Sequence, residues 1–342
     1  MKWWQGSSTN SAVPQADDQQ WLNDSRSNGV TLNIEELLNY QQKTGILDLS
    51  PRHTNQSKLA GNYLSKTKGR GMEFDEVRHY NPGDDIRTID WRVTARTGKT
   101  HTKLFREEKE RPIFILCDLS DNMFFGSKLL FKSVQAAHLA ALIAWTAKKR
   151  GDKVGGLVFN QSSHRELKPK SRQHGVLQIL HALTTLHQTG IEHLSQPTSE
   201  AEASDSAAKQ RSLLEDACAR LRRLAHPGSL VFVISDFKQT SDITMKHLSQ
   251  IARHCEVVAC EVSDPMEHEL PTSSHKQSLQ VSDGKNRKTI FIGDKQSETQ
   301  YKDNALQRFT ENHQLLKRHK IQLTEITAAR PLEAQLKGAA KR

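Results

Sequence analysis

Apolar residues gather in short unbroken runs along residues 112–327, and these runs are separated by stretches in which apolar positions recur every three or four residues. Unbroken apolar runs predict strands that are buried on both faces, because a half-buried strand alternates apolar and polar positions. The predicted strands cover residues 113–117, 154–159, 230–234, 256–262 and 321–326. The predicted helices cover residues 127–150, 174–187, 213–225, 242–254 and 298–318. Strands that alternate with helices indicate βαβ units, a parallel sheet and right-handed crossovers.

The two ends of the chain have a different character. Residues 1–30 are rich in Ser, Asn, Gln and Asp. This composition predicts a mobile polar arm, since it offers little apolar surface to offset the entropy of ordering. Residues 31–56 predict a short helix that docks on the main body, capped by Asn33, followed by a linker. Residues 328–342 form a basic tail that we expect to be frayed.

Residues 57–111 are dense in glycine, aspartate, arginine and aromatic residues. Within them, Asn81-Pro82-Gly83-Asp84 is a strong turn signal, because proline fixes its φ near the turn value and glycine accepts a positive φ. The pattern predicts a small β-rich region of short strands joined by turns.

Two of the predicted strands run into carboxylates. Asp118, Ser120 and Asn122 follow the strand over 113–117, and Asp236 follows the strand over 230–234. Ligands of open parallel sheets bind beyond the carboxyl ends of the strands, so these side chains are the first candidates for a binding site. A shared site requires Asp118 and Asp236 to converge at one edge of the sheet. In the alternative interpretation, each aspartate only caps a helix or satisfies amides at the strand end.

These segments resemble the metal-ion-dependent adhesion site of von Willebrand A domains, in which Asp-x-Ser-x-Ser follows the first strand and another Asp follows a later strand. Over about residues 58–265, the chain also resembles the bacterial family catalogued as domain of unknown function fifty-eight, a von Willebrand A-like group. The matching residues are Arg78-x-Tyr80-x-x-Gly83-Asp84-Asp85-x-Arg87-x-Ile89-Asp90-Trp91, Thr94-Ala95-Arg96, Phe105-x-x-Glu108, Asp118 and Gly151-Asp152-x-Val154-Gly155.

The resemblance implies the fold class and the partner. The fold is α/β, with a von Willebrand A-like (Rossmann-like), mostly parallel sheet and helices on both faces over residues 112–327, beside the small β-rich region. The implied partner is a MoxR-type AAA+ ATPase.

The resemblance further implies a Mg²⁺ site, with Asp118, Ser120 and Asn122 in or near the coordination sphere and Asp236 holding a water molecule. Mg²⁺ requires about six oxygen ligands in near-octahedral order. This sequence departs from the pattern, because Asn122 stands where a second serine is usual and the usual threonine has no clear counterpart. An asparagine carbonyl can supply an oxygen but reaches further than a hydroxyl, so we expect a degenerate site with weakened metal binding.

The motif between residues 78 and 91 has two interpretations, a surface for a partner or an internal structural network. Its candidate residues are Arg78, Tyr80, Gly83, Asp84, Asp85, Arg87, Asp90 and Trp91. Arginine and carboxylate side chains form bidentate pairs that fix orientation. Carboxylates beside arginines lose basicity and make poor general acids, so we favour the structural network.

Composition and charge say more about the expected cellular compartment than about the kind of binding partner. The formal net charge of +10 is compatible with nucleic acid, anionic lipid or an acidic protein surface. The sequence contains no apolar run of the about 18 residues that span a bilayer and no secretory signal, so we expect a cytoplasmic protein whose membrane contact is at most peripheral. Four scattered cysteines without a C-x-x-C pair suit a reducing compartment.

The sequence lacks the motifs of common covalent chemistry, among them the P-loop, the G-x-S-x-G elbow and H-E-x-x-H. We therefore expect a non-enzymatic adaptor that works with a MoxR-type AAA+ ATPase in chaperone-like assembly or maturation of other proteins. Its strand-end face, with or without Mg²⁺, would dock an acidic group of the partner. Two alternatives stay open. One is a nucleic-acid-binding protein or metal-dependent nuclease, and the other is a structural scaffold with a metal-dead site.

Overall fold

The computed structural model describes residues 15–49, 72–107, 111–195, 213–238, 240–270, 277–282, 287–292 and 295–337. The chain divides into two compact units. The larger unit comprises Met1–Leu49 and Arg111–Arg342, and the smaller unit comprises Ser50–Glu110. Among the described residues, none of the helices combines the length and the apolar character that crossing a bilayer requires.

The larger unit is built on a six-stranded sheet with the strand order β10-β7-β6-β3-β4-β5. Its strands are β3 (Ile113–Leu119), β4 (Val154–Asn160), β5 (His164–Lys170), β6 (Leu230–Ser235), β7 (Glu256–Ser263) and β10 (Gln322–Thr327). Neighbouring strands from β10 to β4 are parallel, and β5 pairs with β4 in the antiparallel direction. Every residue of β3, β4 and β6 is buried. The prediction of a mostly parallel α/β sheet is therefore confirmed.

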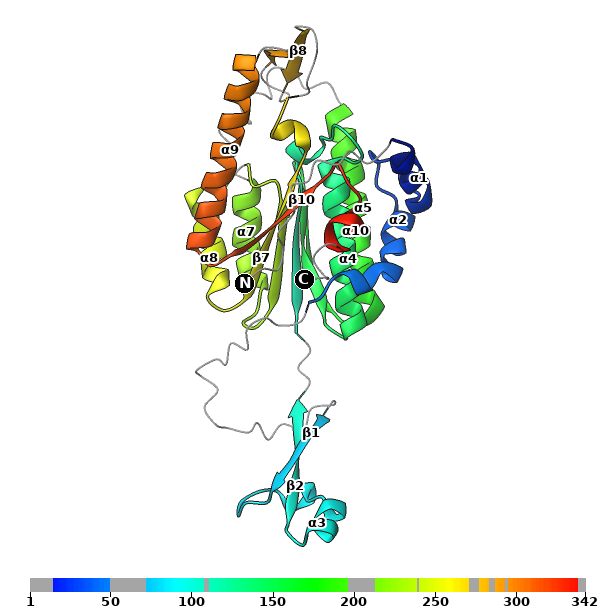
Figure 1. Cartoon of the computed structure of the whole chain (residues 1–342), viewed down its shortest axis with the longest axis vertical. Coiled ribbons are helices and arrows are strands. Elements are labelled where there is room, and N and C mark those ends of the chain that lie inside the picture. The colour runs from blue at the N-terminus through cyan, green and yellow to red at the C-terminus, as the bar shows by residue number, and fades with distance from the viewer. Residues whose placement is uncertain are drawn as a thin grey trace. The chain divides into compact units, whose positions relative to one another are not determined.

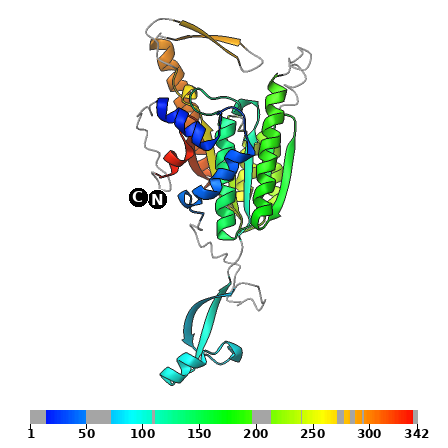
Figure 2. The same ribbon diagram turned by 90° about the vertical axis from the view of Figure 1, so that its right-hand side faces the viewer.

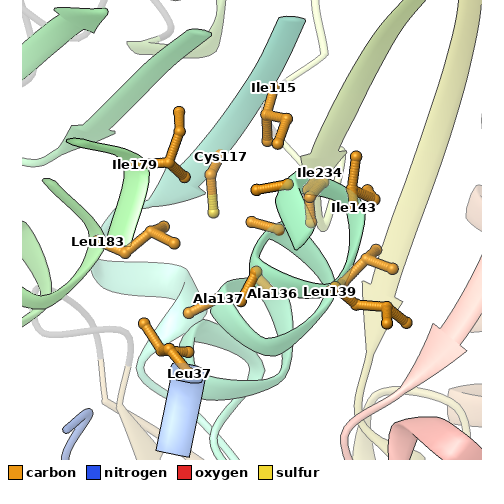
Figure 3. Packing of buried hydrophobic residues seen from close by; sticks show 14 of the residues in the cluster. Leu37, Ile115, Cys117, Ala136, Ala137, Leu139, Ile143, Ile179, Leu183 and Ile234 are labelled. Atoms are coloured by element: carbon orange, nitrogen blue, oxygen red, sulfur yellow. The ribbon is translucent and has the colours of Figure 1, made fainter. Parts of the chain in front are cut away.

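Helices cover both faces of this sheet (Figure 1). One face carries α4 (Lys132–Arg150) and α5 (Arg172–Ser195), and the other carries α7 (Leu213–Leu224), α8 (Asp242–Ala252) and α9 (Lys295–Arg318). Successive residues of a strand point to opposite faces, so β3 contributes Ile115 and Cys117 to one hydrophobic cluster and Phe114 and Leu116 to the other. Figure 3 shows part of the first cluster, where side chains of β3, α4 and α5 meet.

The N-terminal segment corrects one prediction. Residues 15–25 form helix α1 (Gln15–Ser25) and are not a mobile arm. Trp21 and Leu22 pack against the first hydrophobic cluster and supply the apolar surface that the overall composition concealed. Residues 1–14 lie outside the described residues.

The predicted docking helix corresponds to α2 (Ile34–Asn39), which is followed by the 3₁₀ helix η1 (Tyr40–Ile46). Both pack along the outer side of α4, as Figure 2 shows. The indole N–H of Trp145 on α4 donates a hydrogen bond of 3.0 Å to the carbonyl of Leu37. Leu37 is fully buried, so this short helix is part of the core of the larger unit.

The C-terminal tail is also more ordered than predicted. Residues 332–337 form helix α10 (Leu332–Lys337), and Leu332 and Leu336 are buried in the first cluster. Two leucines four residues apart on one helical face anchor the segment despite its basic composition. Residues 338–342 lie outside the described residues.

Short elements follow the carboxyl ends of the central strands. The 3₁₀ helix η3 (Asp121–Met123) follows β3, and the 3₁₀ helix η4 (Pro265–Glu267) follows β7. A hairpin of β8 (Gln277–Ser282) and β9 (Arg287–Ile292) lies between η4 and α9. Of these, η3 and η4 directly follow the strand ends at the edge of the sheet where the candidate site lies.

The smaller unit pairs β1 (Met72–His79) with β2 (His101–Glu107) in the antiparallel direction. Between these strands lie the 3₁₀ helix η2 (Ile86–Thr88) and helix α3 (Trp91–Thr97). The region predicted over 57–111 therefore contains a helix as well as strands. Residues 50–71 and 108–110 lie outside the described residues.

Candidate functional site

Asp118 and Asp236 meet at the carboxyl edge of the sheet. β3 and β6 are adjacent and parallel, with Cys117 opposite Ile234, so the next residues of both strands arrive at the same level. The Ser235 hydroxyl donates a hydrogen bond of 2.6 Å to Oδ2 of Asp118, and the Ser120 amide donates one of 2.9 Å to Oδ1. Both aspartates are buried, at 4% and 6% exposure. The structure thus brings together two carboxylates that lie far apart in the sequence.

Lys132, the first residue of α4, reaches into the same edge. Its ammonium group lies 2.7 Å from Oδ2 of Asp236 and 2.7 Å from Oε1 of Glu267, which belongs to η4. Lys132 is fully buried. We use the term strand-end site for Asp118, Lys132, Ser235, Asp236 and Glu267.

The outer side of the strand-end site is closed by further polar contacts. Lys238 donates from its ammonium group to Oε1 of Glu267 at 2.7 Å and from its backbone amide to Oδ1 of Asp236 at 3.1 Å. Asp264, the N-terminal cap of η4, accepts hydrogen bonds from the amide and the hydroxyl of Ser127. These contacts join the loop after β3 to the loop after β7.

The buried charges shift one another's protonation. Burial, together with the charge of Asp236, raises the pKa of Asp118 to about 6, although hydrogen bonds from Ser235 and Ser120 oppose the shift. Burial alone would lower the pKa of Lys132, but the charges of Asp236 and Glu267 outweigh it and raise that pKa above its usual value. Burial would likewise raise the pKa of Glu267, and the neighbouring ammonium groups of Lys132 and Lys238 lower it instead.

The predicted metal ligands do not fit a divalent ion in this arrangement. Asp118 and Asp236 already accept hydrogen bonds at all four carboxylate oxygens, and one of the donors is a buried ammonium group. Ser120 is buried, and Asn122 is half-buried on η3. Within the described ranges, no group of three or more His, Cys, Asp or Glu side chains is arranged to hold a metal. A cation on Asp236 would therefore have to share its carboxylate with Lys132.

Part of the motif in the smaller unit is a local structural network. The Arg78 guanidinium lies 2.8 Å from Oδ1 of Asp84, whose other oxygen accepts the amide of Asn81. Asp85 caps η2, and Asp90 caps α3 through the amides two and three residues ahead. Backbone hydrogen bonds are the main cause of the lowered pKa of Asp84 and of Asp90. The Tyr80 hydroxyl lies 3.4 Å from the Asp84 carbonyl, and Gly83 adopts a φ of +109° in the predicted turn.

The other part of the motif faces solvent. Trp91 and Ile86 are each 66% exposed, and Arg87 is exposed as well. On α3, Trp91, Arg92, Ala95 and Arg96 are all exposed, whereas Val93 and Thr94 are half-buried. These four exposed residues occupy two adjacent i,i+4 rows of one helix surface. We refer to Trp91, Arg92, Ala95 and Arg96 as the α3 face.

Sequence reasoning did not single out Lys132 or Glu267. Lys132 begins α4, where acidic residues are favoured over basic ones, but the predicted helix starts at residue 127, so this signal emerges only once the observed helix start is known. Glu267 had only a local signal, the Asp-Pro-x-Glu pattern of a capping box. Neither signal indicates that the two residues meet.

The fold and the strand-end site define an α/β protein with polar residues at the carboxyl ends of a mostly parallel sheet. The family model described as "Protein of unknown function DUF58" matches residues 76–311. The chain belongs to this family, as the motif predicted.

The chain is similar in sequence to several uncharacterized bacterial proteins. The chain is 29% identical over 225 residues to the uncharacterized protein Mb1516 of Mycobacterium bovis and equally to Rv1480 of Mycobacterium tuberculosis, covering 66% of this chain and 65% of theirs. The chain thus spans about two thirds of the length of these relatives. A shorter match, 30% identical over 77 residues, is to the uncharacterized protein YeaD of Bacillus subtilis and covers 22% of this chain and 16% of YeaD.

Among solved structures, the chain is similar to an aerotolerance-related membrane protein from Bacteroides fragilis in which several residues are mutated to serine. The TM-score is 0.40 at 14% identity, covering 68% of this chain and 97% of that one.

Proposed function

We propose that this protein is a non-enzymatic adaptor that binds other proteins through the α3 face. The von Willebrand A-like character of the larger unit and a MoxR-type AAA+ ATPase as partner enter this proposal from the motif resemblance. The cytoplasmic location enters it from the composition and cysteine pattern of the sequence. The observation that carries the proposal is the exposed tryptophan on a small unit in which Thr102 is the one buried residue among those whose exposure the structure describes. Buried tryptophan and arginine residues dominate binding energy at protein interfaces.

The α3 face combines the features that such an interface needs. Trp91 offers a large apolar surface, and Arg92 and Arg96 flank it. Within the described part of the chain, the side chains of Arg92 and Arg96 form neither an ion pair nor a hydrogen bond. Two arginines four residues apart on a helix repel each other. An acidic partner surface would offset this electrostatic repulsion.

The strand-end site supports binding less directly. Asp118 and Asp236 are buried and fully hydrogen-bonded, so a partner's acidic group does not reach them without opening the site. The hydrogen bonds to both carboxylates also argue against a nucleophile or a general base at this edge, because neither carboxylate is open to a substrate. We therefore place the partner contact on the α3 face and not at the strand ends.

Binding to the purified MoxR-type ATPase of the same organism tests this proposal. Trp91→Ala and the double substitution Arg92→Glu/Arg96→Glu should each weaken binding at least about tenfold, as expected for interface hot spots. Matched controls are Ile243→Ala, an exposed apolar residue on α8, and Arg253→Glu, an exposed cation after α8. Both controls should bind like the unmodified protein in isothermal titration calorimetry.

Two outcomes would contradict the proposal. One is that the Trp91→Ala variant binds the ATPase with the same affinity as the unmodified protein. The other is preferential binding of duplex DNA with a steep salt dependence, which would favour the nucleic-acid alternative.

A further inference from the structure

We propose that the ammonium group of Lys132 is the resident cation of the strand-end site. It holds carboxylates from different loops together, as a bound divalent metal would otherwise do. The site is then independent of metal. This inference concerns the larger unit and holds whatever partner the α3 face binds.

The position of Lys132 is unfavourable unless its charge has a role. It is the first residue of α4, where the helix dipole opposes a positive charge, and its side chain is fully buried. A buried ammonium group is retained only when carboxylates pair with it and satisfy its protons. Asp236 and Glu267 do so, each at 2.7 Å.

These two carboxylates come from different parts of the fold. Asp236 follows β6, and Glu267 lies on η4 after β7, while Lys132 itself begins α4. One ammonium group therefore ties a helix to the carboxyl ends of two neighbouring strands. A metal ion at a strand-end site has the same bridging effect, since it draws ligands from several loops to one point.

The contacts also leave no favourable place for a second cation. An ion that coordinated Asp236 would lie within a few ångströms of the buried Lys132 ammonium group, and like charges at that separation repel strongly where water is excluded. The pKa of Lys132 is raised by Asp236 and Glu267 against the effect of burial, so the lysine stays charged at neutral pH.

The first test uses the unmodified full-length chain, freed of metal with EDTA and then titrated with Mg²⁺ and Mn²⁺. We expect no saturable heat in isothermal titration calorimetry and no change in the midpoint of thermal unfolding beyond measurement error. Saturable binding of either ion that Asp118→Asn abolishes would overturn the proposal. This test does not depend on whether any Lys132 variant folds.

The second test removes the cation. Lys132→Met removes the buried ammonium group that pairs with both Asp236 and Glu267, and we expect the midpoint of thermal unfolding to fall by about 10 °C. Lys128→Met, which changes an exposed lysine in the loop that precedes α4, is the matched control and should leave the midpoint unchanged.

A double-mutant cycle separates the charge pair from a general loss of packing. Asp236→Asn should also lower the midpoint, and the combined variant Lys132→Met/Asp236→Asn should lose less than the sum of the two single losses. Strictly additive losses, or a Lys132→Met protein as stable as the unmodified one, would contradict the assignment.

Discussion

Asp118 and Lys132 are both buried ionisable residues, yet their surroundings act on their charges in opposite ways. Lys132 lies between two carboxylates, which favour its charged form. Asp118 faces the like charge of Asp236, and only neutral donors, the Ser235 hydroxyl and the Ser120 amide, hydrogen-bond to it. The folded protein therefore retains a proton on Asp118 over a pH range in which an exposed aspartate would release it.

The stability of the fold should depend on this proton. The pKa of Asp118 is about 6 in the folded protein against an ordinary value of 3.8, so between these values the folded state binds a proton that the unfolded state releases. The contribution of Asp118 to stability is thus most favourable below about pH 4 and is lost as the pH rises through about 6. The full loss is on the order of 3 kcal/mol.

Asp118→Asn removes this titration and provides the comparison. As the pH rises from about 4 to about 7, the unmodified protein should lose stability relative to Asp118→Asn in urea unfolding. The difference between the two proteins is the quantity to measure, because other groups titrate equally in both. A difference that stays constant with pH would show that Asp118 ionises normally.

At the scale of elements, the close approach of β3 and β4 depends on a glycine. Gly156 lies opposite Ile115 in the parallel register, and a Cβ atom at Gly156 would come within 2.0 Å of the Ile115 carbonyl oxygen. A backbone atom of a central strand cannot move aside as a flexible side chain can. Glycine at this position allows the two strands to keep their register.

Gly156→Ala should therefore be strongly destabilising. We expect a loss of about 3 kcal/mol or more in the free energy of unfolding, at the upper end of the cost of overpacking a core. Gly45→Ala is the matched control, because a Cβ atom there meets nothing within 4 Å and φ is not positive. Chemical denaturation of both variants measures the contrast, and equal stability of the two would contradict the close approach.

Two elements that the sequence did not predict, β5 and α3, share a cause. β5 (His164–Lys170) carries five charged or histidine side chains among its seven residues. It forms a strand only because the edge of β4 offers backbone hydrogen-bond partners. α3 is a single short helix fixed by the cap at Asp90. Such elements depend on neighbours or caps more than on apolar periodicity, which is the main signal in a sequence.

The two units of the molecule differ in how many of their described residues are buried. In the larger unit, two hydrophobic clusters enclose the sheet. In the smaller unit, Thr102 is the one buried residue among those whose exposure the structure describes. A two-stranded sheet by itself is only marginally stable.

Hydrogen exchange should reveal this difference. Backbone amides of β3 and β6 should exchange only through global unfolding, and amides of β1 and β2 should exchange faster by at least about a hundredfold. Hydrogen-exchange mass spectrometry on the full-length chain can compare the peptides directly. Equal protection in both units would mean that the smaller unit is stabilised by contacts beyond its own core.

The sequence by itself determined the parallel sheet, its helices and the family. Strands buried on both faces appear as unbroken apolar runs, and helices appear as a three-to-four-residue period, so both signals are local. The convergence of Asp118 and Asp236 also followed, because the ends of adjacent parallel strands share an edge.

Only the tertiary structure decided which cation pairs with Asp236. Lys132 meets Asp236 and Glu267, which lie 104 and 135 residues further along the chain, and no local pattern encodes contacts of that range. Whether a lysine points to solvent or into a site depends on which charges the fold places around it, since burial without partners is too costly.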